Sequence, residues 1–237
     1  NIIICNKPAG LAVQKDFKNK ENVLNDQLLF YLFEKGEYLP GNDSAFTPSI
    51  CNRLDRNTSG IVLFGKNFRA VQELNAVIKN RKIDKFYLTL VVGVLKDEGS
   101  IEAYHLKENK NNKAEIFAEN KDQSKKIITK YKTLSKSEKY SLAEVELITG
   151  KTHQIRAGFQ FIKHCVVGDK KYGDLAVNRY FKEKFDFDNQ FLHAYKVVFN
   201  DFDGFFGYLS GKEFFAPLDE KKKKIAVDLF GEGSVLF

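Results

Sequence analysis

The chain has 237 residues, 43% of them hydrophobic and 29% charged, the composition of a globular protein able to bury a substantial core. Its 38 basic and 31 acidic side chains give a net charge of +7, which suits a polyanionic partner or simply a solubilising surface. No apolar run approaches the roughly 20 residues that a membrane span needs. The cysteines are three in number and scattered (Cys5, Cys51 and Cys165), which favours a reducing, cytoplasmic compartment over a disulfide framework or a zinc site.

In the first half of the chain, short apolar segments alternate with helical patterns. The spacing of apolar residues and the turn signals predict a strand at 2–5, a helix over 22–35, a strand at 61–64, a helix capped by Asn67 and a strand at 86–94. In the helix after Asn67, we expect the buried stripe to consist of Phe68, Val71, Leu74 and Ile78.

The second half begins with a polar, hairpin-like excursion at 107–125. Thr152 is predicted to cap a helix whose core face is Ile155, Phe159 and Ile162. The other elements expected are strands at 126–134, 140–148, 191–199 and 213–216, and a terminal helix over 219–230. Because strands outnumber helices without regular βαβ alternation, the chain is predicted to be one α+β domain with a mixed, largely antiparallel sheet.

One segment, Asn52-Arg53-Leu54-Asp55-Arg56-Asn57-Thr58-Ser59-Gly60, places a carboxylate between two guanidinium groups just before a predicted strand. Two neighbouring cations favour the ionised form of Asp55, and an ionised carboxylate in a cleft can act as nucleophile, base or electrostatic stabiliser. Only six of the 38 basic residues are Arg, so the pair at Arg53 and Arg56 stands out. A surface ion-pair cluster is the alternative reading.

Two further segments place polar or aromatic groups where they could join such a site. In Leu147–Arg156, a strand ends, Gly150 turns the chain, and Arg156 falls on the first turns of the next helix. In Lys85–Gly93, alternation places Tyr87 on the strand face opposite Phe86 and Leu88. A tyrosine there could stack on a nucleobase. Capping and core packing would also account for Thr152, Ile155 and Tyr87, but would not require His153 or Arg156.

Metal or nucleotide chemistry finds little support in the sequence. The four histidines, His105, His153, His164 and His193, do not form a metal-ligand spacing with one another or with the cysteines. A glycine-rich phosphate loop is also missing from the pattern, so we expect neither a metal nor a nucleotide cofactor.

Taken together, these segments resemble the RluA family of pseudouridine synthases, and especially its RluC-like branch, which acts on the large ribosomal subunit. The resemblance runs in order through NKPAGLAVQ, CNRLDRNTSGIVLFGKN, KFYLTLVVG, LITGKTHQIRAGF, HCVVGDKKYGD, FLHAYKVVF and FFAPL. The RLDRxTSG block followed about 90 residues later by TGxTHQIR is the most specific part.

The resemblance implies roles for individual residues. Asp55 falls on the family's catalytic aspartate, Tyr87 on the tyrosine that packs on the target base, and Arg156 on the arginine that pairs with the catalytic carboxylate. Arg53 falls where related enzymes help to displace the base. The further residues expected to contact RNA are Arg56, Thr58, Lys85, Lys151, His153 and Gln154.

The resemblance also implies a single catalytic domain, residues 1–237, built on a bent, mixed, mainly antiparallel sheet flanked by helices. It implies no cofactor and no metal, a structured RNA as partner, above all 23S ribosomal RNA, and a monomer that does not bind membranes. Members of this branch carry a small S4-type RNA-binding domain before the catalytic domain, and we expect one to precede residue 1. Lys151, Gly158 and Lys163 depart from the usual pattern, which affects only expected local RNA contacts.

Two other functions remain open from the residues alone. The chain could be a non-catalytic RNA-binding protein with the same fold, which would not need Asp55. It could also be a hydrolase that uses Asp55, but hydrolysis of a glycosidic bond normally requires a second carboxylate, for which Asp169 and Asp174 are the candidates.

Overall fold

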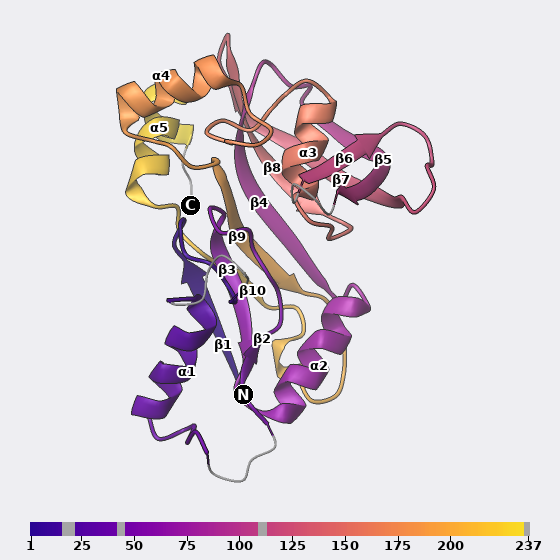
Figure 1. Ribbon diagram of the computed structural model, residues 1–237, viewed down its shortest axis with the longest axis vertical. Coiled ribbons are helices and arrows are strands. Elements are labelled where there is room, and N and C mark those ends of the chain that lie inside the picture. The colour runs from indigo at the N-terminus through magenta and orange to yellow at the C-terminus, as the bar shows by residue number, and fades with distance from the viewer. Residues whose placement is uncertain (16–21, 42–45, 109–112, 235–237) are drawn as a thin grey trace. The chain divides into compact units, whose positions relative to one another are not determined.

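The computed structural model describes residues 1–15, 22–41, 46–108 and 113–234 (Figure 1). The order of the strands is β1-β3-β9-β4-β8-β7-β5-β6, with β2 on β3 and β10 on β9, and every pair with a determined register is antiparallel. The α+β class and the mainly antiparallel sheet predicted from the sequence are therefore confirmed. Among the residues described, no helix is long and apolar enough to cross a membrane.

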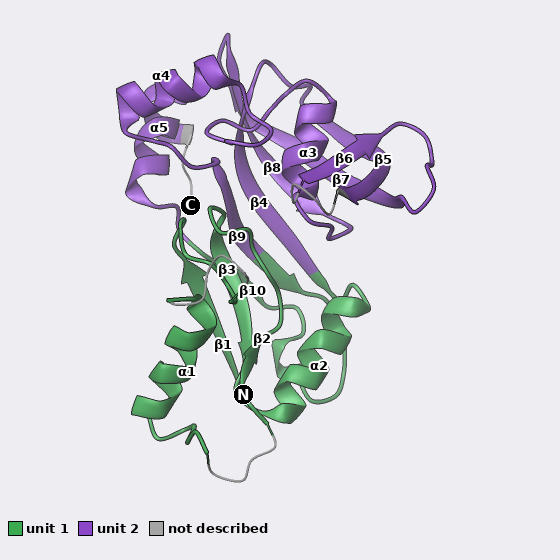
Figure 2. Cartoon of the chain, in the orientation of Figure 1, with its two compact units in different colours: residues 1–83, 197–216 green, residues 84–196, 217–237 purple. Residues whose placement is uncertain are grey.

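The chain divides into two compact units, shown in Figure 2. Unit 1 comprises residues 1–83 and 197–216, and unit 2 comprises residues 84–196 and 217–237. Strand β9 (Leu192–Phe199) contributes 192–196 to unit 2 and 197–199 to unit 1. That the whole chain forms one catalytic domain stays a prediction.

Unit 1 contains the first strands and two helices. Its elements are β1 (Ile2–Lys7), α1 (Leu24–Glu34), β2 (Ser49–Ile50), β3 (Ser59–Gly65), α2 (Phe68–Lys79), the 3₁₀ turn η1 (Gly207–Leu209) and β10 (Glu213–Phe215). Strand β3 is buried along its whole length, and the core packs Leu63 against Leu74 of α2 and Phe199 of β9. The apolar runs that predicted these strands are thus core runs.

Helix α2 begins as predicted, because the side chain of Asn67 accepts a hydrogen bond from the N–H of Ala70. Its predicted stripe is partly wrong. Leu74 is fully buried, but Phe68 is 63% exposed, and Ala70 takes the second buried position. The buried face of the helix therefore begins at Ala70, and the ring of Phe68 lies outside the core and packs edge-on against Phe46.

Unit 2 carries most of the antiparallel ladder. Its elements are β4 (Ile83–Val92), β5 (Glu98–Glu108), β6 (Lys113–Phe117), β7 (Lys125–Lys136), β8 (Tyr140–Leu147), α3 (Gln154–Phe161), α4 (Leu175–Phe185), α5 (Glu220–Phe230) and the 3₁₀ turn η2 (Glu232–Ser234). The predicted excursion at 107–125 consists of the end of β5, strand β6 and the turn before β7, with 109–112 outside the described residues. Helices α4 and α5 cover a core around Leu90, Phe181 and Ile225.

The correction to the α2 stripe can be tested by a pair of alanine substitutions. Leu74→Ala removes a fully buried side chain, and we expect it to lower the free energy of unfolding by about 2–5 kcal/mol. Phe68→Ala removes an exposed ring with one aromatic neighbour, for an expected loss of at most about 1.5 kcal/mol. Urea unfolding measures both values. Equal losses would mean that Phe68 is a core residue.

Candidate active site

Asp55 lies in a loop of unit 1 that is tied to strand β3. The side chain of Asn52 accepts the N–H of Leu63 at 2.6 Å and donates to the carbonyl of Ile61 at 3.3 Å. On the other side of Asp55, the N–H of Thr58 donates to the carbonyl of Asp55 at 3.0 Å. The backbone of the half-buried Asp55 is therefore fixed directly before a buried strand, which is how a rigid scaffold presents a functional side chain.

A buried lysine joins this loop to the turn after β1. Lys7 is fully buried, and its ammonium donates to the carbonyls of Pro8 at 2.9 Å, Leu11 at 2.8 Å and Arg56 at 2.9 Å. Two further hydrogen bonds join Gly10 of the same turn to Arg56. The N–H of Gly10 donates to the carbonyl of Arg56, and Nε of Arg56 donates to the carbonyl of Gly10. A buried ammonium needs such oxygen partners, so the NKPAG turn holds the residue that follows Asp55.

The sequence did not identify this function of Lys7. Its only signal is a lysine at the end of an apolar strand and before Pro-Ala-Gly, a position that more often faces solvent. The two arginines that flank Asp55, Arg53 and Arg56, are exposed, as a role in contacting a large substrate requires, and Thr58 is buried.

Tyr87 lies on β4 in unit 2, opposite Val145 of β8, and is 6% exposed. Phe86 and Leu88 pack on the other face of the strand with Tyr195, so the predicted alternation is confirmed. Lys85 is half-buried near Gly150, and burial lowers the pKa of its ammonium. A lysine that has already lost part of its water binds an anion at a smaller further desolvation cost.

The turn into α3 differs from the expected cap. Thr152 does not cap this helix. The N-cap is His153, with φ 55 in the left-handed region and no side-chain capping bond. The side-chain amide of Gln154 instead fixes the turn before the helix, because its oxygen accepts the N–H of Lys151 at 3.0 Å and the hydroxyl of Thr149 at 2.9 Å.

The nitrogen of the same amide donates to the carbonyl of Ile128 at 3.1 Å and to the hydroxyl of Thr129 at 2.9 Å. Gln154 is 2% exposed and ties the start of α3 to β7. Lys151 beside it is exposed.

Arg156 forms a buried ion pair with Asp169. Its Nε lies 2.6 Å from one carboxylate oxygen of Asp169, and its Nη2 lies 2.8 Å from the other. The side chains are 7% and 0% exposed. Burial alone would raise the pKa of Asp169, but hydrogen bonds from Arg156 and from the N–H groups of Lys171 and Tyr172 hold that pKa below its ordinary value.

Both candidates for a second catalytic carboxylate thus have structural roles. Asp169 accepts hydrogen bonds from Arg156 and two backbone N–H groups, and Asp174 caps α4 by accepting the N–H of Val177. These bonds weaken the hydrolase reading.

The predicted site residues fall in two groups. Arg53, Asp55, Arg56 and Thr58 belong to unit 1, and Lys85, Tyr87, Lys151, His153, Gln154 and Arg156 belong to unit 2. Within unit 2, Arg156 lies near its sequence neighbour His153, since both contact Tyr172. That the two groups act in one site stays a prediction.

The family model of RNA pseudouridylate synthases matches residues 1–161, about two thirds of the chain, including Asp55, Tyr87 and Arg156. The chain belongs to the RNA pseudouridylate synthase family. This membership confirms the resemblance to the RluA family inferred from the RLDRNTSG and TGKTHQIR segments.

Several curated relatives of the family are similar over most of the chain. An uncharacterized RNA pseudouridine synthase of Mycoplasma genitalium is 38% identical over 84% of this chain and 61% of its own length. The ribosomal large subunit pseudouridine synthase D of Borreliella burgdorferi is 30% identical over 73% of this chain and 52% of its own length. The tRNA pseudouridine synthase C of Vibrio cholerae is 28% identical over 84% of this chain and 81% of its own length.

The chain spans about three fifths of the Mycoplasma protein and half of the Borreliella protein. Among solved structures, human RNA pseudouridylate synthase domain containing 1 is similar with a TM-score of 0.68 and 21% identity, over 91% of this chain and 79% of that one. This likeness supports the fold.

The buried ion pair of Arg156 and Asp169 predicts that the free energy of unfolding depends on pH. The folded pKa of Asp169 lies below the unfolded value of 3.8, so its stabilisation is complete above that value and is lost as the pH falls through the folded pKa. At about pH 7, Asp169→Asn should lower the free energy of unfolding by about 3–5 kcal/mol, because Arg156 loses its counter-charge.

This gap between wild type and variant should narrow when urea unfolding is repeated at about pH 3. Asp203→Asn, at an exposed position, should leave the stability unchanged at both pH values. A gap that stays constant would show that the charge of Asp169 does not stabilise the fold.

Proposed function

We propose that this chain isomerises uridine to pseudouridine in structured RNA, with Asp55 as the catalytic carboxylate. The observation that carries the proposal is the family match over residues 1–161, which contains Asp55 in a loop held by Lys7, Asn52 and Thr58. We further propose that Tyr87 packs on the target base and that Arg156 pairs with Asp55, as the resemblance to the RluA family implies.

The chemistry needs few groups once the base is within reach. A uracil inside folded RNA must first be flipped out, at a cost of a few kcal/mol. The N1–C1′ bond then breaks, the base turns, a C5–C1′ bond forms, C5 loses a proton and N1 gains one. Because the base returns to the same sugar, no water has to be activated, and one carboxylate can suffice where hydrolysis would need two.

We propose that the substrate is large-subunit ribosomal RNA, with transfer RNA as the second candidate. We therefore also propose that the protein acts in the cytoplasm. The motifs resemble the RluC-like branch, and the Borreliella relative carries a large-subunit name at 30% identity. The Vibrio relative carries a transfer-RNA name at 28% identity, so transfer RNA is the alternative substrate. Mapping pseudouridines in cells with and without the gene separates the two, because lost sites in 23S RNA support the first and lost sites in transfer RNA the second.

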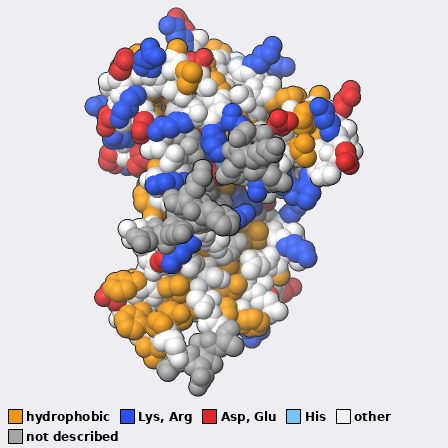
Figure 3. All heavy atoms as spheres, in the orientation of Figure 1, with side chains coloured by type: hydrophobic (Ala, Val, Ile, Leu, Met, Phe, Trp, Pro, Cys, Tyr) orange, Lys and Arg blue, Asp and Glu red, His pale blue; other side chains and the backbone are white. Residues whose placement is uncertain are grey.

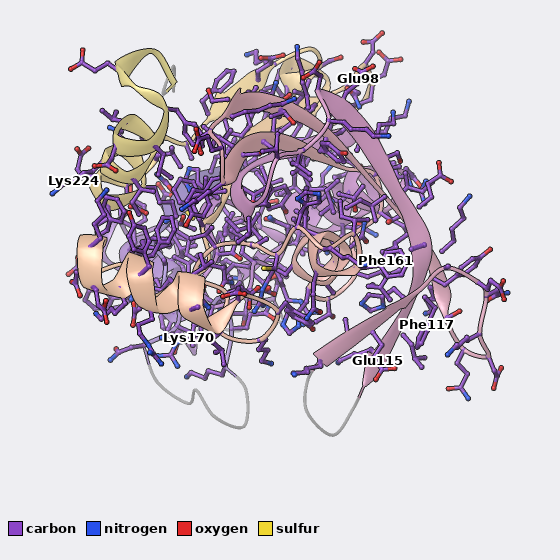
Figure 4. The ribbon with its side chains drawn as sticks, turned by 90° about the horizontal axis from the view of Figure 1, so that it is seen from above. Glu98, Glu115, Phe117, Phe161, Lys170 and Lys224 are labelled. Carbon is purple, nitrogen blue, oxygen red and sulfur yellow. The ribbon has the colours of Figure 1, made fainter. Side chains whose placement is uncertain are left out.

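The Lys and Arg side chains are dispersed over the surface, which favours RNA binding through many separate contacts to phosphate groups. On the face seen in Figure 3, Lys and Arg side chains of unit 2 lie among Asp and Glu side chains, while apolar side chains gather over α1 of unit 1. In the run Lys221–Lys224, ion pairs join Lys221 to Asp186, Lys222 to Asp219 and Lys223 to Glu220. Lys224 is exposed on the outer side of α5 (Figure 4).

The lysines of the 107–125 excursion and the start of β7 offer more exposed charge. The described and exposed ones are Lys107, Lys113, Lys121, Lys125 and Lys126, of which Lys126 pairs with Glu102. Together with Arg53, Arg56 and Lys151, they are proposed to contact RNA. Thr58 and Gln154 were also expected to contact RNA, but both are buried, so we propose that they shape the loops that carry these contacts. His153 and Lys85 are proposed to contact the RNA, Lys85 near Tyr87.

Replacing the proposed catalytic carboxylate tests the activity. Asp55→Asn keeps the size of the side chain and removes its charge, so it should abolish pseudouridine formation while RNA affinity stays within about threefold. The measurement is mass spectrometry of nucleosides from RNA incubated with each protein, beside filter binding. Asp203→Asn, an exposed carboxylate of the same unit, is the control and should retain full activity. Turnover by Asp55→Asn within about tenfold of wild type would refute the assignment.

Binding through phosphate contacts predicts that the affinity for RNA depends steeply on salt concentration. Contacts to phosphates release counterions, so the affinity should fall by orders of magnitude as salt rises, with little difference between a ribosomal fragment and a scrambled hairpin. Filter binding of both RNAs across a salt series measures this. If strong discrimination between the two RNAs persists at high salt, this chain reads its target directly, and the picture of dispersed phosphate contacts is wrong.

A further inference from the structure

Arg156 is held by a loop that lies beyond the residues matched by the family model. The loop runs from Gly168 to Asp174, after the matched 1–161 segment and before α4. Its Asp169 takes two of the five N–H donors of Arg156, at Nε and Nη2, in a bidentate arrangement with both side chains buried. Lys170, labelled in Figure 4, is its exposed neighbour.

The loop is itself fixed in place. Asn178 of α4 accepts the N–H of Gly168 at 2.8 Å and donates to the carbonyl of Asp169 at 2.9 Å. Gly168 has φ +77, and a Cβ there would come within 2.0 Å of the carbonyl oxygen of Asn189, so no other residue fits. The N–H groups of Lys171 and Tyr172 hold the carboxylate from the loop side.

An aromatic ring borders the guanidinium group of Arg156 as well. The ring of Tyr172 lies 5.2 Å from the Cζ of Arg156, within cation–π range. The hydroxyl of Tyr172 accepts the N–H of Ala114 at 2.6 Å and contacts Nδ1 of His153 at 3.0 Å. The same loop therefore supplies both the carboxylate and the ring that fix the plane of the guanidinium group.

We propose that Asp169 is a positioning residue for the isomerisation and acts through Arg156. Two donors of Arg156 point at Asp169, which determines the direction in which the other three, on Nη1 and Nη2, point. The carboxylate of Asp169 already accepts four hydrogen bonds, so it orients Arg156 and does not exchange a proton with the substrate. The proposal rests on the proposed function, in which Arg156 acts with Asp55.

A double-mutant cycle tests the proposal. Asp169→Asn should lower kcat on a structured uridine-containing RNA by about 10- to 100-fold, because a misoriented group near the reacting atoms costs about that much. KM should stay within about threefold. In the Arg156→Lys background, where the bidentate pair is already lost, adding Asp169→Asn should lower kcat by less than about threefold.

Equal losses of kcat in both backgrounds would overturn the proposal, since Asp169 would then act independently of Arg156. A change in KM alone would also overturn it. Asp228→Asn, which breaks an exposed ion pair with Lys184 in the same unit, is the matched control and should leave kcat unchanged.

A second variant covers the case in which Asp169→Asn fails to fold. Asn178→Ala removes the side chain that holds the loop and leaves both charged groups in place, and it should lower kcat several-fold with KM unchanged. Full activity of folded Asn178→Ala and Asp169→Asn, in a preparation whose wild type makes pseudouridine, would refute the positioning role alone. A wild type that makes no pseudouridine would refute the proposed function instead.

Discussion

A charged side chain can be buried only where oxygen atoms replace the water that it loses. Each unit buries such a cation, either next to a residue of the proposed site or as part of that site. In unit 1, the ammonium of Lys7 is held by three carbonyl oxygens, one of which belongs to Arg56 next to Asp55. In unit 2, the guanidinium of Arg156 is held by both oxygens of Asp169. Neither cation can move without leaving polar groups unsatisfied, so each fixes the local backbone.

This arrangement holds the backbone in place at two candidate catalytic residues, one on a loop and one on a short helix. Asp55 precedes the fully buried strand β3, and Arg156 lies on the short helix α3, whose start is tied to β7 by Gln154. A loop between such anchors has little freedom, so its side chains need not be ordered again when RNA binds. In the proposed function, RNA is held through dispersed phosphate contacts, and the chemistry depends on a few fixed groups.

Much of the fold follows from local patterns in the sequence. Apolar runs gave β1, β3 and β4, leucines at helical spacing gave α1, and Asn67 marked the start of α2. The longest of the missed elements are β5 and α4. Strand β5 was not recognised because its sequence, EGSIEAYHLKE, begins with Glu-Gly-Ser and has a single β-branched residue, Ile101. Helix α4 was not recognised because its apolar stripe, Val177, Phe181 and Phe185, is interspersed with polar and charged residues and has only Phe181 fully buried.

The candidate site likewise has residues that local sequence patterns identify and residues that they do not. Asp55, Tyr87 and Arg156 stand out as candidates because RLDRNTSG, KFY and THQIR are recognisable segments. The partner of Arg156 could not be predicted, because Asp169 lies 13 residues away beyond the end of a helix, and only the folded loop brings the pair together. The roles of Lys7 and Gln154 likewise depend on carbonyl groups distant in sequence.

The proposed reaction breaks the bond between uracil and its sugar and rejoins the base through C5. RNA labelled with tritium at C5 of uridine tests it most directly, because the isomerisation must release that hydrogen to water. We expect tritium release matched one to one by pseudouridine in the RNA, with no free uracil. Free uracil would indicate a hydrolase, and binding of the RNA with no release at all would indicate a protein that only binds it. Either result would show that the chain does not isomerise uridine.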